Sequence, residues 1–181
     1  LEKNYKDGKL HGLLTKWNEK GQKIEEENYV NDSIHGLSNS YFVNGKLKEQ
    51  KKFSNGKLDG PYHLWGIDLT TPKVDTTGNY IFDQYGYQVF DTTHFKNVQG
   101  QFQKGEMIGE WIEWYNNGQK KKQSSYYIGK FETDGGPKKT NWSYQVGLYR
   151  EWYPDGENKV MGNYDSTWVS FSSPGGWNDY K

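Results

Sequence analysis

Pairs of glycines nine residues apart recur along this chain and limit most strongly what it can fold into. GLLTKWNEKG, GLSNSYFVNG, GEWIEWYNNG and GLYREWYPDG begin at Gly12, Gly36, Gly109 and Gly147, and a shortened copy, GPYHLW, begins at Gly60. The residue five positions after each leading glycine is aromatic: Trp17, Tyr41, Trp65, Trp114 and Trp152. Self-similarity of this kind is the sequence signature of a repeat protein.

Each copy predicts a β-hairpin. Segments of alternating character flank the turns NEKG, VNG, YNNG and YPDG, in which Gly, Asn and Asp tolerate the positive φ of hairpin connections. Chained hairpins form an antiparallel meander. Equivalent aromatic residues, two strands apart, then lie on one face at a separation of about 10 Å and form a structural ladder.

Composition agrees with this fold. The chain has no alanine but has 22 Gly, 8 Trp, 15 Tyr and 8 Phe, and Ala is the best helix former whereas aromatic residues favour strands. We therefore predict an all-β protein of tandem β-hairpin repeats that form an elongated, twisted antiparallel meander.

Spacing divides this single repeat domain, residues 1–181, into regular and irregular parts. The first three leading glycines lie 24 residues apart, whereas the intervals from Gly60 to Gly109 and from Gly109 to Gly147 are 49 and 38 residues and are each expected to hold an inserted or degenerate copy. The parts are regular repeats at 5–65, an insertion or degenerate repeat at 66–101, a repeat at 102–128, a loop insertion at 129–146, and the last repeat with a C-terminal tail at 147–181. Insertions between repeats often serve as binding elements. Trp168 and Trp177 in the tail are expected to cap the last sheet edge.

Charge disfavours several classes of partner. Lys and Arg together number 23, as do Asp and Glu, and Arg150 is the single arginine. Nucleic acids and anionic membranes are bound through clustered Lys and Arg, so neither is expected as the main partner. The chain has no cysteine and hence no disulfide or thiolate metal site.

No pattern of catalytic residues stands out, so we do not expect an enzyme. Nucleophile elbows, phosphate-binding loops and zinc-protease motifs are missing from the sequence. Glu110, Glu113 and Glu151 recur at repeat positions, which favours a solvated surface over a catalytic carboxylate pair. His11 and His35 precede leading glycines two strands apart, too far to share a metal ion. No metal or cofactor is therefore expected.

The repeats also resemble a known family. YKDGKLHGLLTKWNEKG at residues 5–21, followed by FSNGKLDG and FQKGEMIG, is similar to the MORN repeat, and the period resembles the bacterial MORN-variant family. The resemblance implies a non-catalytic module that mediates protein–protein interaction. Many bacterial members are described as antitoxin components of toxin–antitoxin systems, which would make a toxin the partner and the cytoplasm the compartment.

A carbohydrate- or cell-wall-binding repeat protein is the alternative hypothesis. Flat aromatic rings stack well on sugars, and four aromatic residues are candidates to face a ligand: Trp111, Tyr115, Tyr149 and Tyr153. Such a protein would act at the cell envelope or after secretion, following removal of a signal segment. The sequence leaves the compartment open.

Overall fold

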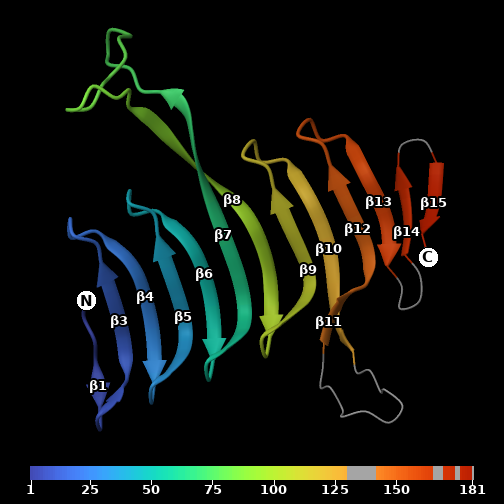
Figure 1. Ribbon diagram of the computed structural model, residues 1–181, viewed down its shortest axis with the longest axis horizontal. Helices are drawn as coiled ribbons and strands as arrows, with labels where there is room; N and C mark the ends of the chain where they lie inside the picture. The colour runs from blue at the N-terminus through green and yellow to red at the C-terminus, as the bar shows by residue number, and fades with distance from the viewer. Residues whose placement is uncertain (130–141, 165–168, 174–175, 181) are drawn as a thin grey trace.

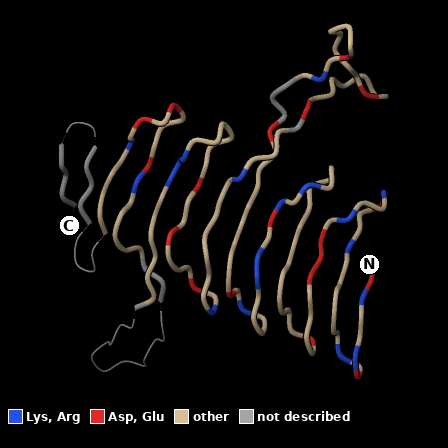
Figure 2. Tube along the Cα trace, turned by 180° about the vertical axis from the view of Figure 1, so that it is seen from behind, with Lys and Arg blue, Asp and Glu red and all other residues tan. Residues whose placement is uncertain are grey.

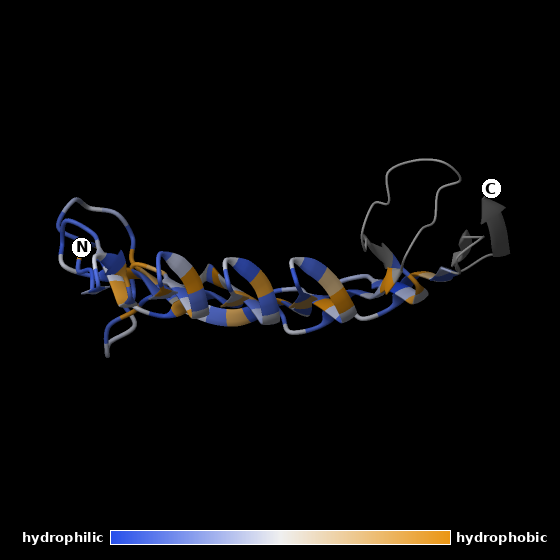
Figure 3. Cartoon of the chain, turned by 90° about the horizontal axis from the view of Figure 1, so that it is seen from below, coloured by the Kyte–Doolittle hydropathy of each residue, from blue (hydrophilic) through white to orange (hydrophobic). Residues whose placement is uncertain are grey.

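The chain folds into one long antiparallel sheet (Figure 1). The structure is a computed structural model, and it describes residues 1–129, 142–164, 169–173 and 176–180. None of these residues is helical, and none therefore forms a helix able to cross a bilayer. Figure 3 shows the described strands following one another in a thin, elongated layer. The predicted all-β meander is confirmed.

Thirteen strands form the main sheet, in the order β15-β14-β13-β12-β10-β9-β8-β7-β6-β5-β4-β3, with β11 paired to β10 beside this path. A separate two-stranded sheet joins β1 to β2. The bounds are β1 Tyr5–Lys6, β2 Lys9–Leu10, β3 Gly12–Trp17, β4 Lys23–Val30, β5 Ser33–Tyr41, β6 Leu47–Ser54, β7 Lys57–Pro72, β8 Phe90–Gln103, β9 Glu106–Trp114, β10 Lys120–Gly129, β11 Trp142–Gln145, β12 Gly147–Trp152, β13 Asn158–Tyr164, β14 Val169–Ser173 and β15 Gly176–Tyr180.

Both irregular segments of the sequence lengthen hairpins. Residues 66–95 continue β7 and β8 past the edge at which the neighbouring turns end, so that the third hairpin projects from the sheet (Figure 1). At the opposite edge, β11 pairs with the end of β10, while residues 130–141 of the second irregular segment lie outside the described residues. In the C-terminal tail, β14 and β15 add two strands to the sheet, and Trp168 lies outside the described residues.

The leading glycines share a backbone conformation that explains their recurrence. Gly12, Gly36, Gly60, Gly109 and Gly147 have φ between 64° and 129°, a region that costs an L-residue with a side chain about 1–2 kcal/mol. At Gly36 and Gly60 this conformation accompanies a register shift against the preceding strand. The glycine therefore sets a bulge at the start of the repeat.

The core is a single row of side chains across one face. It runs through the residues two positions after each leading glycine: Leu14, Ser38, Tyr62, Trp111 and Tyr149. Leu14 and Trp111 are the buried hydrophobic residues of the described chain, at 5% and 9% exposed. Around Trp111 the row alternates large and small, because Trp111 pairs with Ser124 and Tyr62 with Gly100.

Aromatic rings gather around Trp111. Its ring centroid lies 5.6 Å from that of Tyr62, 5.1 Å from that of Phe102 and 6.4 Å from that of Tyr126. Edge-to-face and tilted pairs at such separations contribute about 0.5–1.5 kcal/mol each beyond their burial. This aromatic cluster takes the place of a deep core in a sheet that has no second layer over its described residues.

The aromatic residues five positions after the leading glycines form a ladder on the other face. Lysines lie on three of the four intervening strands, where Trp17 pairs with Lys23, Trp65 with Lys96 and Trp114 with Lys120. On β6, Leu47 pairs with Tyr41. Each ammonium also lies near the next ring, with Lys23 at 5.8 Å from the Tyr41 centroid, Lys96 at 5.5 Å from Trp114 and Lys120 at 5.8 Å from Trp152. We call the five aromatic residues together with Lys23, Lys96 and Lys120 the edge ladder. Its cation–π contacts stabilise the sheet by about 0.5–1 kcal/mol each.

Candidate functional site

The projecting third hairpin ends in two compact turns. The amide of Gly78 donates to the Asp75 carbonyl and that of Asp75 to the Asn79 carbonyl; Gly86, Asp83 and Tyr87 repeat the arrangement. The turns that join β3 to β4 and β9 to β10 have the same pair of hydrogen bonds. The hairpin tip, which we define as residues 73–90, is therefore built from the turn that the repeats already use.

Three backbone segments meet below these turns. Lys73 donates its amide proton to the Val89 carbonyl at 2.8 Å, Val89 donates to Ile81 at 2.8 Å, and Ile81 donates to Lys73 at 2.9 Å. The three residues are spaced eight apart, so each segment leaves the ring of hydrogen bonds, makes a turn and returns. This closed arrangement holds the tip together without a buried core.

Aspartate side chains fix both turns. Asp75 Oδ1 accepts hydrogen bonds from the amides of Thr77 and Asn79 and from the Thr77 hydroxyl, at 2.7 to 3.0 Å. The Thr77 hydroxyl first, and then the amides, lower the pKa of Asp75 to about 2. Asp83 Oδ1 accepts from the amides of Tyr85 and Tyr87. The Asp–x–x–Gly pattern at an eight-residue spacing is the sequence signal that could have predicted these turns.

Large apolar and aromatic side chains are exposed on the tip. Five of them have exposed fractions between 47% and 75%: Val74, Tyr80, Phe82, Tyr85 and Tyr87. They are close in sequence and are held by the same two turns. A monomer rarely exposes such a concentration of apolar surface without a role in binding. These five residues, the tip patch, are the candidate functional site, and none of them was singled out from the sequence.

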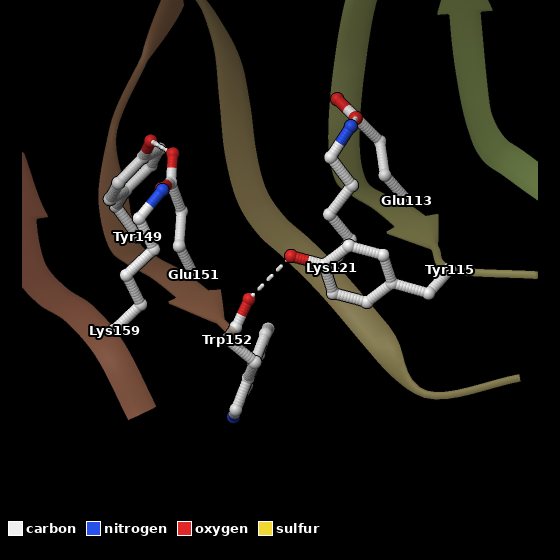
Figure 4. A network of polar contacts seen from close by, with 7 residues as sticks. All are labelled: Glu113, Tyr115, Lys121, Tyr149, Glu151, Trp152 and Lys159. Carbon is white, nitrogen blue, oxygen red and sulfur yellow. Dashed lines mark hydrogen bonds and ion pairs between the residues drawn. The ribbon is translucent and has the colours of Figure 1, made fainter. Parts of the chain in front are cut away.

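The four aromatic residues predicted to face a ligand have different surroundings. Trp111 is buried in the aromatic cluster and offers no ring face to a ligand. Tyr115 donates its hydroxyl to the Trp152 carbonyl at 2.9 Å, and Tyr149 donates to Glu151 (Figure 4). Tyr153 is 46% exposed. The structure thus does not bring these four together into one binding surface.

A polar network surrounds two of these tyrosines. Lys159 lies 3.3 Å from the Glu151 carboxylate, and Lys121 lies 3.7 Å from that of Glu113 (Figure 4). Burial first, and then the hydrogen bond to Glu151, raises the pKa of Tyr149, whereas the Tyr149 hydroxyl and Lys159 lower the pKa of Glu151. The Tyr149–Glu151 hydrogen bond joins two residues of β12, and the Lys159–Glu151 ion pair joins β12 to β13.

Three further tyrosines have raised pKa values, from which we predict a titration at alkaline pH. Burial first, and then the carboxylates of Glu27, Glu26 and Glu49, raises the pKa of Tyr29, Tyr41 and Tyr62 to about 12. Because the folded pKa values exceed the unfolded value of about 10, this stabilisation is complete below pH 10 and is lost as the pH rises towards 12. Phenolate absorbance of the native protein should therefore include a phase near pH 12.

The same titration in concentrated urea is the control, because all tyrosines of the unfolded chain should ionise near pH 10. Identical native and unfolded curves would contradict the prediction. The urea midpoint measured at several pH values should stay level up to about pH 10 and then fall.

Over the described ranges, few side chains are arranged to bind a metal ion or to line a reactive pocket. No group of three or more His, Asp or Glu side chains there could hold a metal ion. His35 Nδ1 accepts a long hydrogen bond of 3.4 Å from the Asn55 amide, as suits a residue packed at a repeat junction. Two open hollows lie between the first two turns, beside Gln22, Val43 and Asn44, and neither has a cluster of catalytic side chains.

Comparison with known proteins identifies the repeats. Residues 10–31 and 107–126 match the MORN repeat variant. The first match begins at Leu10 and spans β3 and β4, and the second spans most of β9 and β10, so each covers one leading strand, its turn and its returning strand. No curated protein and no solved structure matches the chain. These two matches agree with the resemblance seen in the sequence: two hairpins of the chain match the model of the MORN repeat variant.

Proposed function

We propose that this chain is a non-catalytic interaction module whose tip patch docks on another protein. The observation that carries the proposal is the exposure of five large apolar side chains at the end of a hairpin that projects beyond the sheet edge. Tyr and Phe are enriched in protein interfaces because their rings give large contact area at a small cost in conformational entropy. A projecting tip can enter a concave surface that the flat sheet could not reach.

The edge ladder is a weaker candidate for binding. Its rings at Tyr41, Trp114 and Trp152 each have a lysine ammonium within 5.8 Å of the centroid, and Trp17 is its one residue among the strongly exposed hydrophobic side chains. A ring already contacted by a cation presents less free face for stacking. We therefore assign the ladder to stabilisation of the sheet and the tip patch to recognition.

Carbohydrate binding remains the second candidate function, and the same tip favours it. Tyr85 and Tyr87 are 75% and 72% exposed, and exposed phenol rings are suited to stacking on sugars. A panel of oligosaccharides tested by tyrosine and tryptophan fluorescence distinguishes the two functions. Protein recognition predicts no tip-dependent change with any glycan, whereas sugar binding predicts a change that is lost when these two tyrosines are replaced.

The decisive variant, which we call the tip variant, carries both Tyr85→Ser and Tyr87→Ser. Neither phenol contributes to the backbone hydrogen bonds of the turn, so the tip should keep its fold while losing its most exposed rings. Truncation of central aromatic contacts typically costs more than 1.4 kcal/mol, or about tenfold in affinity. The matched control is Tyr5→Ser, which removes another exposed tyrosine, 61% exposed, from β1.

Immobilised wild-type protein and both variants are incubated with lysate of the source cells, and retained proteins are quantified by mass spectrometry. We expect one protein retained by the wild type and by Tyr5→Ser but reduced about tenfold with the tip variant. Equal retention by all three would place binding elsewhere on the sheet. If the retained protein is toxic when expressed alone and harmless with this chain, the antitoxin role implied by the family resemblance gains its support.

A further inference from the structure

The tip combines its aromatic side chains with negative charge. The tip and the residue that follows it, 73–91, contain three aspartates, Asp75, Asp83 and Asp91, and one lysine, Lys73. All four are exposed. Lys73 lies 4.0 Å from Asp91 as an exposed pair, so the charges of Asp75 and Asp83 are uncompensated by any ion pair within the tip. Figure 2 shows red segments at the projecting hairpin, while the chain as a whole is neutral.

These carboxylates are fixed in place next to the exposed rings. Asp83 Oδ1 accepts hydrogen bonds from the amides of Tyr85 and Tyr87 at 2.9 and 3.0 Å, so its carboxylate sits within the turn that holds the two most exposed tyrosines of the tip. Asp75 has the same position in the other turn, beside Tyr80. Exposed acidic and aromatic residues thus follow one another along the two turns of the tip.

We propose that the partner surface is basic: an apolar pocket bordered by arginine or lysine side chains. This inference rests on the proposed function and adds the chemistry of the partner. An arginine can stack on Tyr85 or Tyr87 and hydrogen bond to a neighbouring carboxylate at the same time. An acidic partner would place like charges opposite one another, which disfavours binding.

A second copy of this chain fits the tip less well. Five of its lysines lie over aromatic rings within the described residues: Lys23, Lys51, Lys96, Lys120 and Lys122. Four of these also have a hydrogen-bond partner, Glu26 at 2.5 Å, Glu49 at 2.9 Å, Gln99 at 2.9 Å and Gln123 at 3.2 Å respectively for Lys23, Lys51, Lys96 and Lys120. Docking of another copy would have to displace these contacts. We therefore favour a different protein, and self-association becomes an outcome of the test.

The test uses a phage library that displays random-sequence peptides. The library is selected on the whole wild-type protein and counter-selected on the Tyr85→Ser, Tyr87→Ser variant, so that only peptides that need the tip survive. We expect the survivors to carry net positive charge together with at least one aromatic or aliphatic residue. Their affinity should fall as salt is raised, because screening weakens exposed charge pairs.

Isosteric variants then isolate the charge. Asp83→Asn keeps an oxygen that can accept the turn hydrogen bonds but removes the carboxylate charge, and we expect it to weaken the selected peptides several-fold. The matched control is Asp155→Asn, because Asp155 lies in the turn between β12 and β13 and accepts one amide hydrogen bond from Glu157. This control should leave the affinities unchanged.

The outcomes separate the two proposals. Tip-dependent peptides that are neutral or acidic, or whose affinity does not respond to salt or to Asp83→Asn, would overturn the basic partner and leave the interaction module standing. A selection that yields no tip-dependent peptide would overturn both. Concentration-dependent association of the wild-type protein alone in sedimentation equilibrium, lost in the tip variant, would overturn the basic partner in favour of a second copy.

Discussion

Replacing Trp111 by alanine is expected to lower the free energy of unfolding by about 3–5 kcal/mol, the range for large-to-small aromatic substitutions in a core. Trp111 is 9% exposed and contacts the rings of Tyr62, Phe102 and Tyr126. In a single-layer sheet, no other layer can move in to fill the space that the indole leaves. The measurement is urea-induced unfolding followed by far-ultraviolet circular dichroism, with the slope checked for a change in cooperativity.

Two control variants sharpen this prediction. Trp17→Ala removes the same side chain from a site that is 36% exposed, so its cost should be well below that of Trp111→Ala. Trp111→Phe keeps an aromatic ring and removes an indole Nε1 that is buried without a hydrogen-bond partner in the structure, so little hydrogen bonding is lost. Equal effects of Trp17→Ala and Trp111→Ala would contradict the assignment of the core to the row through Trp111.

The sequence allowed the hairpins and the ladder to be predicted because both depend on local rules. The pattern of a glycine with positive φ followed at a constant offset by an aromatic residue does not depend on tertiary contacts. Gly12 with Trp17 shows it as clearly as Gly109 with Trp114. Strand spacing then places the rings at intervals of about 10 Å on one face. The residues between the rings vary more: Lys23 and Lys120 hold the position that Leu47 holds in the second repeat.

The choice of the buried face could not be predicted, because both faces carry aromatic residues. Trp111 and Trp114 lie on opposite faces of β9, and cross-strand neighbours decide which is buried: Trp111 pairs with Ser124, whereas Trp114 pairs with Lys120. In each hairpin a register shift lies beside the fifth-position aromatic, for example between Lys16 and Trp17. Such a bulge changes which residues oppose one another, and its place depends on pairing rather than on one strand alone.

The five residues of the tip patch were not predicted individually, although the segment that contains them, residues 66–101, was predicted to be an insertion or a degenerate repeat. The interval of 49 residues between Gly60 and Gly109 equals two periods plus one, which drew attention to an inserted or degenerate copy and away from a lengthened hairpin. The exposure of Tyr85 and Tyr87 could not be predicted from the sequence, because an aromatic residue of a repeat protein can be buried, as Trp111 is, or exposed. The exposure of Asp75, Asp83 and Asp91 is likewise seen only in the folded hairpin.

Gly100→Ala provides the second large effect and tests the packing of Trp111 directly. A Cβ on Gly100 would lie 2.1 Å from Trp111 Cδ2 and 2.2 Å from Cε2, so the indole would have to move out of the aromatic cluster. Overpacking of a core typically costs about 1–3 kcal/mol, and we expect Gly100→Ala to destabilise the protein by this amount despite the better strand propensity of alanine.

The destabilisation by Gly100→Ala should disappear when the indole ring of Trp111 is absent. In a Trp111→Ala background the added methyl group enters the space that the indole occupied, and a strand residue other than glycine then gains about 0.5–1 kcal/mol from its smaller loss of backbone entropy. The two substitutions are therefore expected to be coupled, with Gly100→Ala changing from destabilising to neutral or stabilising. Unfolding of the two single variants and the double variant measures this coupling. If Gly100→Ala costs the same in both backgrounds, the ring does not lie against Gly100, and the alternation of large and small residues along the core row is not what positions Trp111.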